Sequence, residues 1–527
     1  MIGPRLTKRW PWLAFGCASL WVILIRVPLI VNAENHLDSD LAVDGLTLLE
    51  ATQGHGRWHY PGTPFMGTGP VLLSLPQALI WGVNSSTLVS GGTVAYLGLL
   101  ATTFWMAWRT AGPVVAAWSL VPLTFASTGA LWLSARITGG HLVAAAWHAG
   151  SFALLAGLLS KGGRTRALAL GLWCGLGLYL DSMLSVTIVG IFVAGLATWF
   201  AMGFPRESVM AALFFMIGFL GGVWPRPVGS VIDPHDAYSD QFALLFEKES
   251  LRAHARLLVA ECLPRLISGH NLPGLESDPD LAALTRPTLN RRREPFSPLS
   301  LAVVCLSLTL ALSSIIALAT TLMVASSLIS RLVCAGLSVS MIATLVGFVL
   351  NRNIFNSDNY RYLVGLLPTM ALGFGLLAER TSRGSLSRRI ALMLSVLLLA
   401  GLMTADTLRW YARFGWVDSV GRPLKKHLED PILDWLKAHP DVSWIEGDYW
   451  DIYRLVFLAG GKLKGNPVSI YPNRFPEWRV QTDPVILVRF TPEGVASRNQ
   501  AIRRGYRMVA RNRGVTVLKR LANAEAR

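Results

Sequence analysis

Residues 299–323, LSLAVVCLSLTLALSSIIALATTLM, form an apolar run of 25 positions without a charged side chain. A helix of about 20 such residues spans the roughly 30 Å hydrocarbon layer of a bilayer. Similar runs recur along the 527-residue chain, which is 52% hydrophobic and 15% charged. Since soluble proteins carry roughly 25% charged residues, the composition excludes a soluble multidomain protein and indicates an integral membrane protein.

Apolar runs between charged or turn-rich breaks predict an α-helical polytopic membrane protein of about eleven transmembrane helices. The predicted spans are residues 11–32, 87–108, 113–133, 139–160, 166–181, 183–201, 208–226, 299–323, 326–350, 361–378 and 390–406. Residues 166–201 form one run interrupted by Asp181, which marks either an outer turn or a broken helix. We treat this run as two helices.

The distribution of charge predicts the orientation in the membrane. If the N-terminus is cytoplasmic, the inner segments hold 13 Lys and Arg residues, opposed only by Glu207 and Glu379. Such a bias is typical of cytoplasmic loops. We therefore expect a multi-pass protein of the inner membrane with a cytoplasmic N-terminus and, after an odd number of spans, an extracytoplasmic C-terminus. The first span lacks a small-residue cleavage site and is expected to remain as a helix.

Three substantial outer segments follow from this orientation. Two are loops of a membrane domain at residues 1–406, namely 33–86 and 227–298, and the third is a C-terminal domain at 407–527. The first loop carries five acids and one base, whereas the C-terminal domain carries 21 Lys and Arg against 12 acids. A basic outer surface can face anionic lipid headgroups or a glycan, or can simply be solvated, and nucleic acid is not expected as a partner.

The C-terminal domain has the pattern of a small α/β unit. Helical periodicity covers residues 423–438, 450–458 and 495–505, and short strands are predicted at 442–445, 484–490 and 515–518. Tyr449, Trp450 and Tyr453 have helical spacing and are predicted to belong to the domain core rather than to a glycan platform. The five cysteines fit neither a disulfide framework nor a metal site.

The first outer loop concentrates residues capable of chemistry. Its segment 36–45, HLDSDLAVDG, places Asp40 and Asp44 four residues apart, on one side of a helix predicted at 41–51. Two like charges so placed repel unless the helix dipole, a cation or a metal compensates. A general base beside a second carboxylate, or a divalent metal site, would use this arrangement. The alternative is simple N-capping by Ser39 or Asp40.

A turn-rich segment follows at residues 54–70, GHGRWHYPGTPFMGTGP, and includes His59 and Tyr60. Aromatic rings beside hydrogen-bonding groups can bind a sugar or can anchor a loop in the headgroup layer. Both interpretations place a site at the membrane surface.

The order of these segments resembles a known family. The first span, Asp38-Ser39-Asp40, an amphipathic helix and the Gly/Tyr/Pro-rich segment are followed by RITGGH (136–141), GLGLYLD (175–181), NYRYLVGLLP (359–368) and DYWDIYR (448–454). This order is similar to that of bacterial membrane glycosyltransferases of the C-type fold, related to protein O-mannosyltransferases and the lipid A aminoarabinose transferase. The resemblance covers the membrane domain and extends into the tail.

The resemblance implies transfer of a sugar from a polyprenyl-phosphate carrier to a lipid, glycan or protein acceptor on the outer face. Direct displacement of the carrier phosphate by the acceptor would invert the anomeric centre. The essential acid of the family corresponds to Asp40, as base or as ligand of a divalent metal, with Asp44 as its partner. The family usually has Glu directly after this Asp, where Leu41 stands here, and often has an acid near Thr68. Asp44 or Asp38 can take the place of the missing carboxylate.

Further candidates concern the donor. Arg361 begins a late span at the depth of a carrier phosphate, to which a guanidinium offers bidentate geometry, and Tyr362 lies beside it in sequence. The alternative is an interfacial arginine within an aromatic belt. Arg136 and Arg352 are rival phosphate ligands on other outer turns.

Two more residues are predicted to line the donor site. His141 opens the fourth span and could contact the donor phosphate or a metal, or could be an ordinary interfacial histidine. An ionised Asp181 in an apolar run costs roughly 2.5 to 3.5 kcal/mol unless it faces a cavity or a partner, so we expect it to line a cavity.

Two other classes of function remain open at the level of sequence. A transporter or flippase of a lipid-linked glycan would show polar or broken helices at matching positions in two halves. Asp181 and Arg26 lie inside predicted spans without a corresponding partner set. A degenerate transferase that serves as a scaffold is consistent with Leu41.

Overall fold

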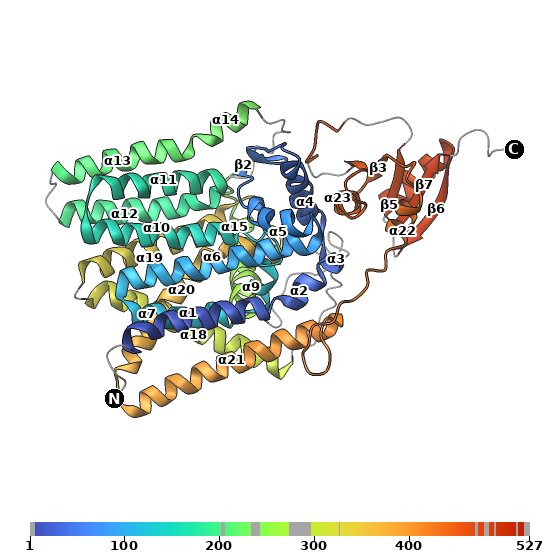
Figure 1. The fold of residues 1–527 in the computed structure, drawn as a ribbon. Helices are drawn as coiled ribbons and strands as arrows, with labels where there is room; N and C mark the ends of the chain where they lie inside the picture. Colours follow the sequence, from blue (N-terminus) through green and yellow to red (C-terminus); the bar gives the residue numbers. More distant parts are fainter. Residues whose placement is uncertain are drawn as a thin grey trace.

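The computed structural model describes residues 6–201, 206–232, 243–272, 297–325, 327–468, 473–478, 484–489, 492–512 and 515–520. Figure 1 shows long helices lying side by side in a bundle, with the C-terminal sheet domain beyond one end of it. We call this end of the bundle the domain end. Parts of the predicted outer loop 227–298, at 233–242 and 273–296, lie outside the described residues.

The bundle consists of long apolar helices. They are α1 (Leu6–Leu24), α6 (Ser85–Ala111), α10 (Leu142–Lys161), α11 (Arg164–Leu180), α12 (Ser185–Ala201), α13 (Arg206–Val223), α18 (Pro298–Val324), α19 (Leu328–Leu350), α20 (Leu366–Ser382) and α21 (Leu386–Phe414). Within the described residues, eight helical segments are long and apolar enough to cross a membrane, or nine when the bent pair η4 (Ser357–Leu363) and α20 counts as one span. The chain is a multi-pass membrane protein.

Two of the predicted spans account for the difference between eleven and nine. Residues 113–133 form three short helices, α7 (Pro113–Ser119), α8 (Val121–Thr124) and α9 (Thr128–Leu133), because Pro122 lacks an N–H and residues 125–127 leave the helix. The fifth span, α11, is only 17 residues long. It ends before Asp181, whose extended backbone separates α11 from α12, so treating residues 166–201 as two helices was correct.

Helices α11 and α13 approach each other through two small-residue motifs. Gly171 and Gly175 on α11 face Gly218 and Gly222 on α13, each motif having the spacing GxxxG. A Cβ atom at Gly175 would collide with the backbone oxygen of Phe219, and one at Gly222 with that of Leu172. This packing fixes the end of α11, and therefore the position of Asp181.

We expect Gly222→Ala to lower the thermal midpoint of the purified protein, because the added methyl group forces two backbones apart. Overpacking of this kind costs about 1 to 3 kcal/mol. Gly221→Ala is the matched control, since a Cβ atom there meets no atom within 4 Å. Equal midpoints for the two variants would contradict the close approach of α11 and α13.

Short elements gather between the spans and at the domain end. They are α2 (Val27–Val31), α3 (Ala33–His36), α4 (Ser39–Thr52), β1 (His59–Tyr60), β2 (Thr63–Gly67), η1 (Val71–Ser74), α5 (Leu75–Trp81), η2 (Ser182–Leu184), α14 (Pro225–Ile232), α15 (Lys248–Leu257), η3 (Leu258–Cys262) and α16 (Leu263–Ser268). The helix predicted at 41–51 is confirmed as α4. Figure 1 shows α3 and α4 at the domain end, with α4 beside α23 (Tyr449–Leu458) of the C-terminal domain.

The C-terminal domain is an α/β unit, as predicted. Its elements are α22 (Pro431–Ala438), β3 (Trp444–Gly447), α23 (Tyr449–Leu458), β4 (Lys464–Pro467), β5 (Val485–Arg489), α24 (Pro492–Arg503), β6 (Tyr506–Asn512) and β7 (Val515–Arg520). They form a five-stranded sheet in the order β4-β3-β5-β7-β6, in which β3 is parallel to β4 and β5, and β7 is antiparallel to β5 and β6.

Several boundaries in this region differ from the prediction. The helix predicted from residue 423 begins only at Pro431, where Asp430 caps it by accepting hydrogen bonds from the backbone N–H groups of Ile432 and Leu433. Strands β4 and β6 were missed because Lys464–Pro467 and Tyr506–Asn512 alternate too weakly to stand out from loop sequence. The last span, α21, continues to Phe414, past the predicted domain boundary at 406.

Candidate functional site

Helix α4 begins with a side-chain cap that frees Asp40 for another role. The carboxylate of Asp38 accepts a hydrogen bond from the backbone N–H of Leu41, with 3.0 Å between the heavy atoms. Ser39 instead donates its hydroxyl to the backbone oxygen of Tyr449. The capping alternative proposed for Ser39 or Asp40 is therefore wrong, because Asp38 is the cap.

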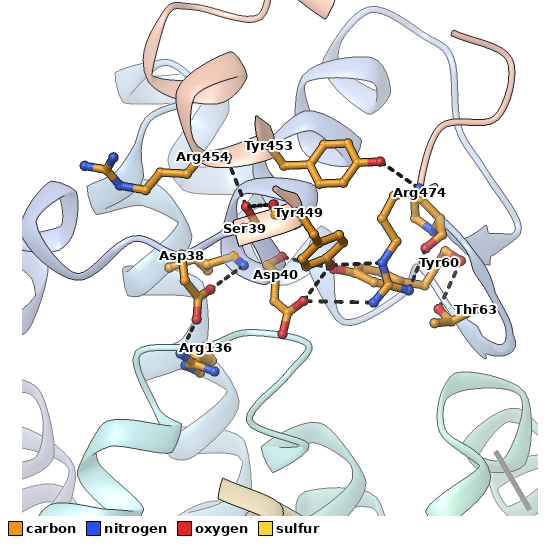
Figure 2. Close-up of polar contacts among 12 residues, drawn as sticks. Asp38, Ser39, Asp40, Tyr60, Thr63, Arg136, Tyr449, Tyr453, Arg454 and Arg474 are labelled. Carbon is orange, nitrogen blue, oxygen red and sulfur yellow. Dashed lines mark hydrogen bonds and ion pairs between the residues drawn. The ribbon is translucent and has the colours of Figure 1, made fainter. Parts of the chain in front are cut away.

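The Asp40 carboxylate lies among three polar groups from distant parts of the chain, and Figure 2 shows two of them, those of Tyr449 and Arg474. Its Oδ1 accepts a 2.7 Å hydrogen bond from the Tyr449 hydroxyl and lies 3.9 Å from Nη2 of Arg474. Its Oδ2 lies 3.9 Å from Nη1 of Arg361. The side chain is 20% exposed, so it is held in place and still reachable.

Asp44, one turn further along α4, has a different environment. It is 1% exposed, and its Oδ2 accepts a 3.4 Å hydrogen bond from the backbone N–H of Thr138. Burial raises the pKa of this carboxyl from 3.8 to about 7. The contact ties α4 to the turn at 136–141, and the burial makes Asp44 a poorer candidate than Asp40 for direct contact with a substrate.

We expect Asp44→Asn to stabilise the protein at pH 8. The raised folded-state pKa means that the ionised carboxylate opposes folding above pH 7, and that this cost vanishes as pH falls toward 4. A shift from 3.8 to about 7 corresponds to a cost on the order of 4 kcal/mol. Thermal midpoints measured from pH 4 to 8 should separate the variant from wild type only toward high pH. A lower midpoint for the variant at pH 8 would mean that the charged carboxylate has a stabilising partner.

Arg136 is engaged within the protein. Its guanidinium forms an ion pair with the Asp38 carboxylate and lies over the Trp132 ring, with 5.2 Å from Cζ to the ring centroid. Both ion-pair partners are buried. The pair joins the start of α4 to the 136–141 turn, and this contact makes Arg136 a weaker candidate than Arg361 for a phosphate ligand.

Arg361 lies where the 136–141 turn meets Asp40. Besides its approach to Asp40, its Nη2 donates to the Tyr362 hydroxyl at 3.3 Å. Within the described part of the chain, its buried Nε has no hydrogen-bond partner. Buried donors are normally satisfied, so an anionic ligand at this position would complete the hydrogen bonding of Arg361.

His141 and Asp181 form a buried pair on a cavity. Nδ1 of His141 lies 2.6 Å from Oδ2 of Asp181, and the His141 and Tyr362 ring centroids are 5.3 Å apart. All three residues line a cavity of about 190 Å³. His141 adopts a left-handed backbone conformation with φ 51°, which is uncommon for a residue with a Cβ atom and often marks functional sites.

A continuous series of contacts therefore connects most of the predicted site. Asp40 approaches Arg361, Arg361 bonds to Tyr362, and the Tyr362 ring lies beside His141, which pairs with Asp181. Residues from α4, η4, the 136–141 turn and the end of α11 thus meet at the domain end.

The two candidate residues of strand β1, His59 and Tyr60, have different surroundings. The Tyr60 hydroxyl donates to the backbone oxygen of Asp40 at 3.1 Å, so this residue belongs to the site. The His59 ring instead lies 6.3 Å from the ring of Tyr179 and packs near Gly229 of α14. Adjacent residues of a strand point to opposite faces, which explains the separation.

Sequence reasoning missed two residues beside Asp40. Tyr449 was assigned to the core of the C-terminal domain, and at 1% exposure it is indeed buried, but its hydroxyl reaches Asp40. Arg474 follows a segment without any recognisable pattern. The DYWDIYR motif was the available signal for Tyr449, and nothing in the sequence indicated Arg474.

The donor set does not fit a divalent metal. Within the described residues, no three His, Cys, Asp or Glu side chains come together as ligands. The Asp40 carboxylate faces two guanidinium groups, and Asp44 is closed off by burial. A cation next to two guanidinium groups would be repelled, so the surroundings of Asp40 disfavour a bound divalent metal.

No family model matches the chain, and no curated protein matches it. Several solved structures do match the chain. The crystal structure of ArnT from Cupriavidus metallidurans bound to undecaprenyl phosphate has a TM-score of 0.60 at 12% identity, covering 98% of this chain and 99% of that one. The apo state of the same protein gives 0.60 and 12%, covering 98% of both chains.

The apo oligosaccharyltransferase of Archaeoglobus fulgidus gives a TM-score of 0.50 at 11% identity, covering 87% of this chain and 64% of that one. At these identities the likeness establishes the fold. The chain has the C-type fold of membrane glycosyltransferases, as the sequence resemblance implied.

Proposed function

We propose that the protein is a membrane glycosyltransferase that moves a sugar from a polyprenyl-phosphate carrier to a hydroxyl group of a lipid, glycan or protein acceptor. The observation that carries this proposal is the partly exposed Asp40 carboxylate, which adjoins Arg361 and, through Tyr362, a cavity of about 190 Å³. The likeness to a protein crystallised with undecaprenyl phosphate supports the class of carrier.

Asp40 acts as the general base in this proposal. The acceptor oxygen attacks the anomeric carbon of the sugar, and the bond from that carbon to the phosphate oxygen breaks. The phosphate leaves with the bonding electron pair, while the acceptor proton passes to the Asp40 carboxylate. Direct displacement of this kind inverts the anomeric centre, and the base must come within hydrogen-bond reach of the attacking oxygen.

Arg361 and His141 serve the leaving phosphate. A guanidinium can bind phosphate through two parallel hydrogen bonds, and Nε of Arg361, which has no partner among the described residues, offers one of them. The Asp181 carboxylate fixes the orientation of the His141 ring. Charge that develops on the departing phosphate is stabilised by donors already in position.

The proposed topology follows the charge bias of the sequence. The domain end faces the extracytoplasmic side of the inner membrane, with the N-terminus in the cytoplasm. The carrier then presents its phosphate at the outer leaflet, at the level of Arg361.

A donor-lipid screen tests the function. Purified protein in vesicles is incubated with a panel of polyprenyl-phosphate sugars and with candidate acceptors, and mass spectrometry follows the glycosylated product. We expect one donor to yield a product with inverted configuration. Movement of the donor across the vesicle membrane without any product would favour the transporter alternative.

A further inference from the structure

We propose that the C-terminal domain completes the catalytic centre, with Tyr449 and Arg474 as positioning residues that hold Oδ1 of Asp40 so that Oδ2 serves as the base. This inference rests on the proposed function and assigns a role to the domain that the function alone does not require. It also distinguishes the two oxygens of one carboxylate.

Two contacts of Oδ1 of Asp40 come from the C-terminal domain. The Tyr449 hydroxyl donates to Oδ1 at 2.7 Å, and Nη2 of Arg474 lies 3.9 Å from the same oxygen. Nε of Arg474 donates in turn to the Tyr449 hydroxyl at 3.0 Å. Figure 2 shows the three side chains converging from α4, α23 and the segment that follows β4.

Oδ2 of Asp40 instead faces the membrane domain. This oxygen faces Nη1 of Arg361 at 3.9 Å, and Arg361 bonds to Tyr362, which lines the cavity. Of the two oxygens, Oδ2 therefore lies toward the group proposed to hold the donor phosphate, where an attacking hydroxyl must arrive.

The C-terminal domain is held firmly enough to fix these contacts. The Ser39 hydroxyl donates to the backbone oxygen of Tyr449 at 2.6 Å and accepts from the backbone N–H of Arg454 at 3.3 Å. Nη1 of Arg474 also donates to the backbone oxygen of Pro61 at 3.2 Å. The outer loop that carries Asp40 is thus hydrogen-bonded both to α23 and to the segment of Arg474.

Ion pairs of Arg57 also join the first outer loop to the segment of Arg474. Arg57 forms a two-pronged ion pair with Glu50, with N–O distances of 2.7 and 3.0 Å, and a further ion pair with Glu477. Its guanidinium also lies over the Phe475 ring. Arg57 is the only Lys or Arg among residues 33–86, and it joins this acidic loop to the segment that carries Arg474.

The chemistry of Tyr449 suits a positioning role. Burial and the neighbouring charge of Asp40 raise the pKa of Tyr449 well above its usual value, despite the opposing charge of Arg474. The hydroxyl therefore remains protonated and donates to Oδ1 throughout the range in which the enzyme would work. A donated hydrogen bond stabilises the ionised carboxylate, so its loss makes the base harder to ionise.

Tyr449→Phe tests the inference in the full-length protein, with the donor and acceptor that wild type turns over. We expect kcat to fall about tenfold or more, since a hydrogen bond to a charged group is lost. We also expect the acidic limb of the pH–rate profile to move to higher pH, with the KM for the donor nearly unchanged. Tyr411→Phe is the control, because it removes a buried hydroxyl that bonds only to the backbone oxygen of Ile25 among the interactions described.

Arg474→Lys keeps a cation near Oδ1 and is expected to retain more activity than Arg474→Met, a rescue that simple loss of packing would not give. If Tyr449→Phe had the kcat and acidic limb of Tyr411→Phe, the inference would be overturned while the proposed function stood. Absence of transfer by wild type with every donor would instead overturn the proposed function. Should Tyr449→Phe fail to fold, the Lys and Met variants of Arg474 decide by the same pH–rate readout.

Discussion

We expect Asp40→Asn to lower the rate of sugar transfer by about 100- to 10,000-fold, the usual contribution of a positioned general base. The amide keeps the size of the side chain and can still accept from the Tyr449 hydroxyl, but it cannot take the proton of the acceptor. Initial rates with a saturating polyprenyl-phosphate sugar measure the loss, and thermal midpoints establish that the variant is folded.

The matched control for this substitution is Glu34→Gln. Glu34 is an exposed acid of the same outer loop, so its loss changes the charge of the loop by the same amount without touching the site. We expect wild-type rates for this variant. An Asp40→Asn protein that transferred sugar as fast as Glu34→Gln would remove Asp40 from the mechanism.

The second large effect concerns the donor phosphate. We expect Arg361→Met to lower kcat/KM for the donor by about 100-fold or more, because a preorganised donor to developing charge contributes about 10²- to 10³-fold. The variant should also bind free polyprenyl phosphate more weakly, which a thermal-shift titration detects as a smaller rise of the midpoint with ligand concentration.

Two companion variants sharpen this test. Arg352, the other arginine that the sequence offers as a phosphate ligand, is exposed in the structure, so we expect Arg352→Met to leave both readouts unchanged. Arg361→Lys should restore only part of the binding, because an ammonium group cannot reproduce the planar fork of a guanidinium. Equal phosphate binding by Arg361→Met and wild type would assign the phosphate to another site.

Much of the fold was accessible from local patterns in the sequence. Uncharged runs such as 299–323 identify transmembrane helices because the bilayer has a fixed thickness, and the acids of the first loop marked the site because α4 carries them on one element. The order of motifs along the chain then predicted that Asp40 and Arg361 belong together, although they are more than 300 residues apart. The structure places them in contact distance.

Two features could not be predicted from the sequence. One is the packing of the C-terminal domain against the first outer loop, and the other is the choice of ion-pair partners in the folded chain. The Tyr449 hydroxyl meets Asp40 across 409 positions, and no helical period in α23 indicates which ring reaches outside its own domain. The sequence also favoured Arg136 as a phosphate ligand, but in the structure its guanidinium forms an ion pair with Asp38. Hydropathy alone favoured one continuous helix at residues 113–133. Pro122 was the available signal that this helix is interrupted.

The most direct test of the central claim follows the phosphorus of the donor. Cleavage of the bond from the anomeric carbon to oxygen converts the phosphodiester of a polyprenyl-phosphate sugar into a phosphate monoester, which phosphorus NMR resolves. With wild-type protein we predict that the monoester appears in step with the glycosylated acceptor, one for one, and that Asp40→Asn slows both equally. A wild-type protein that formed no monoester from any donor, or an Asp40→Asn protein that formed it at the wild-type rate, would contradict the account.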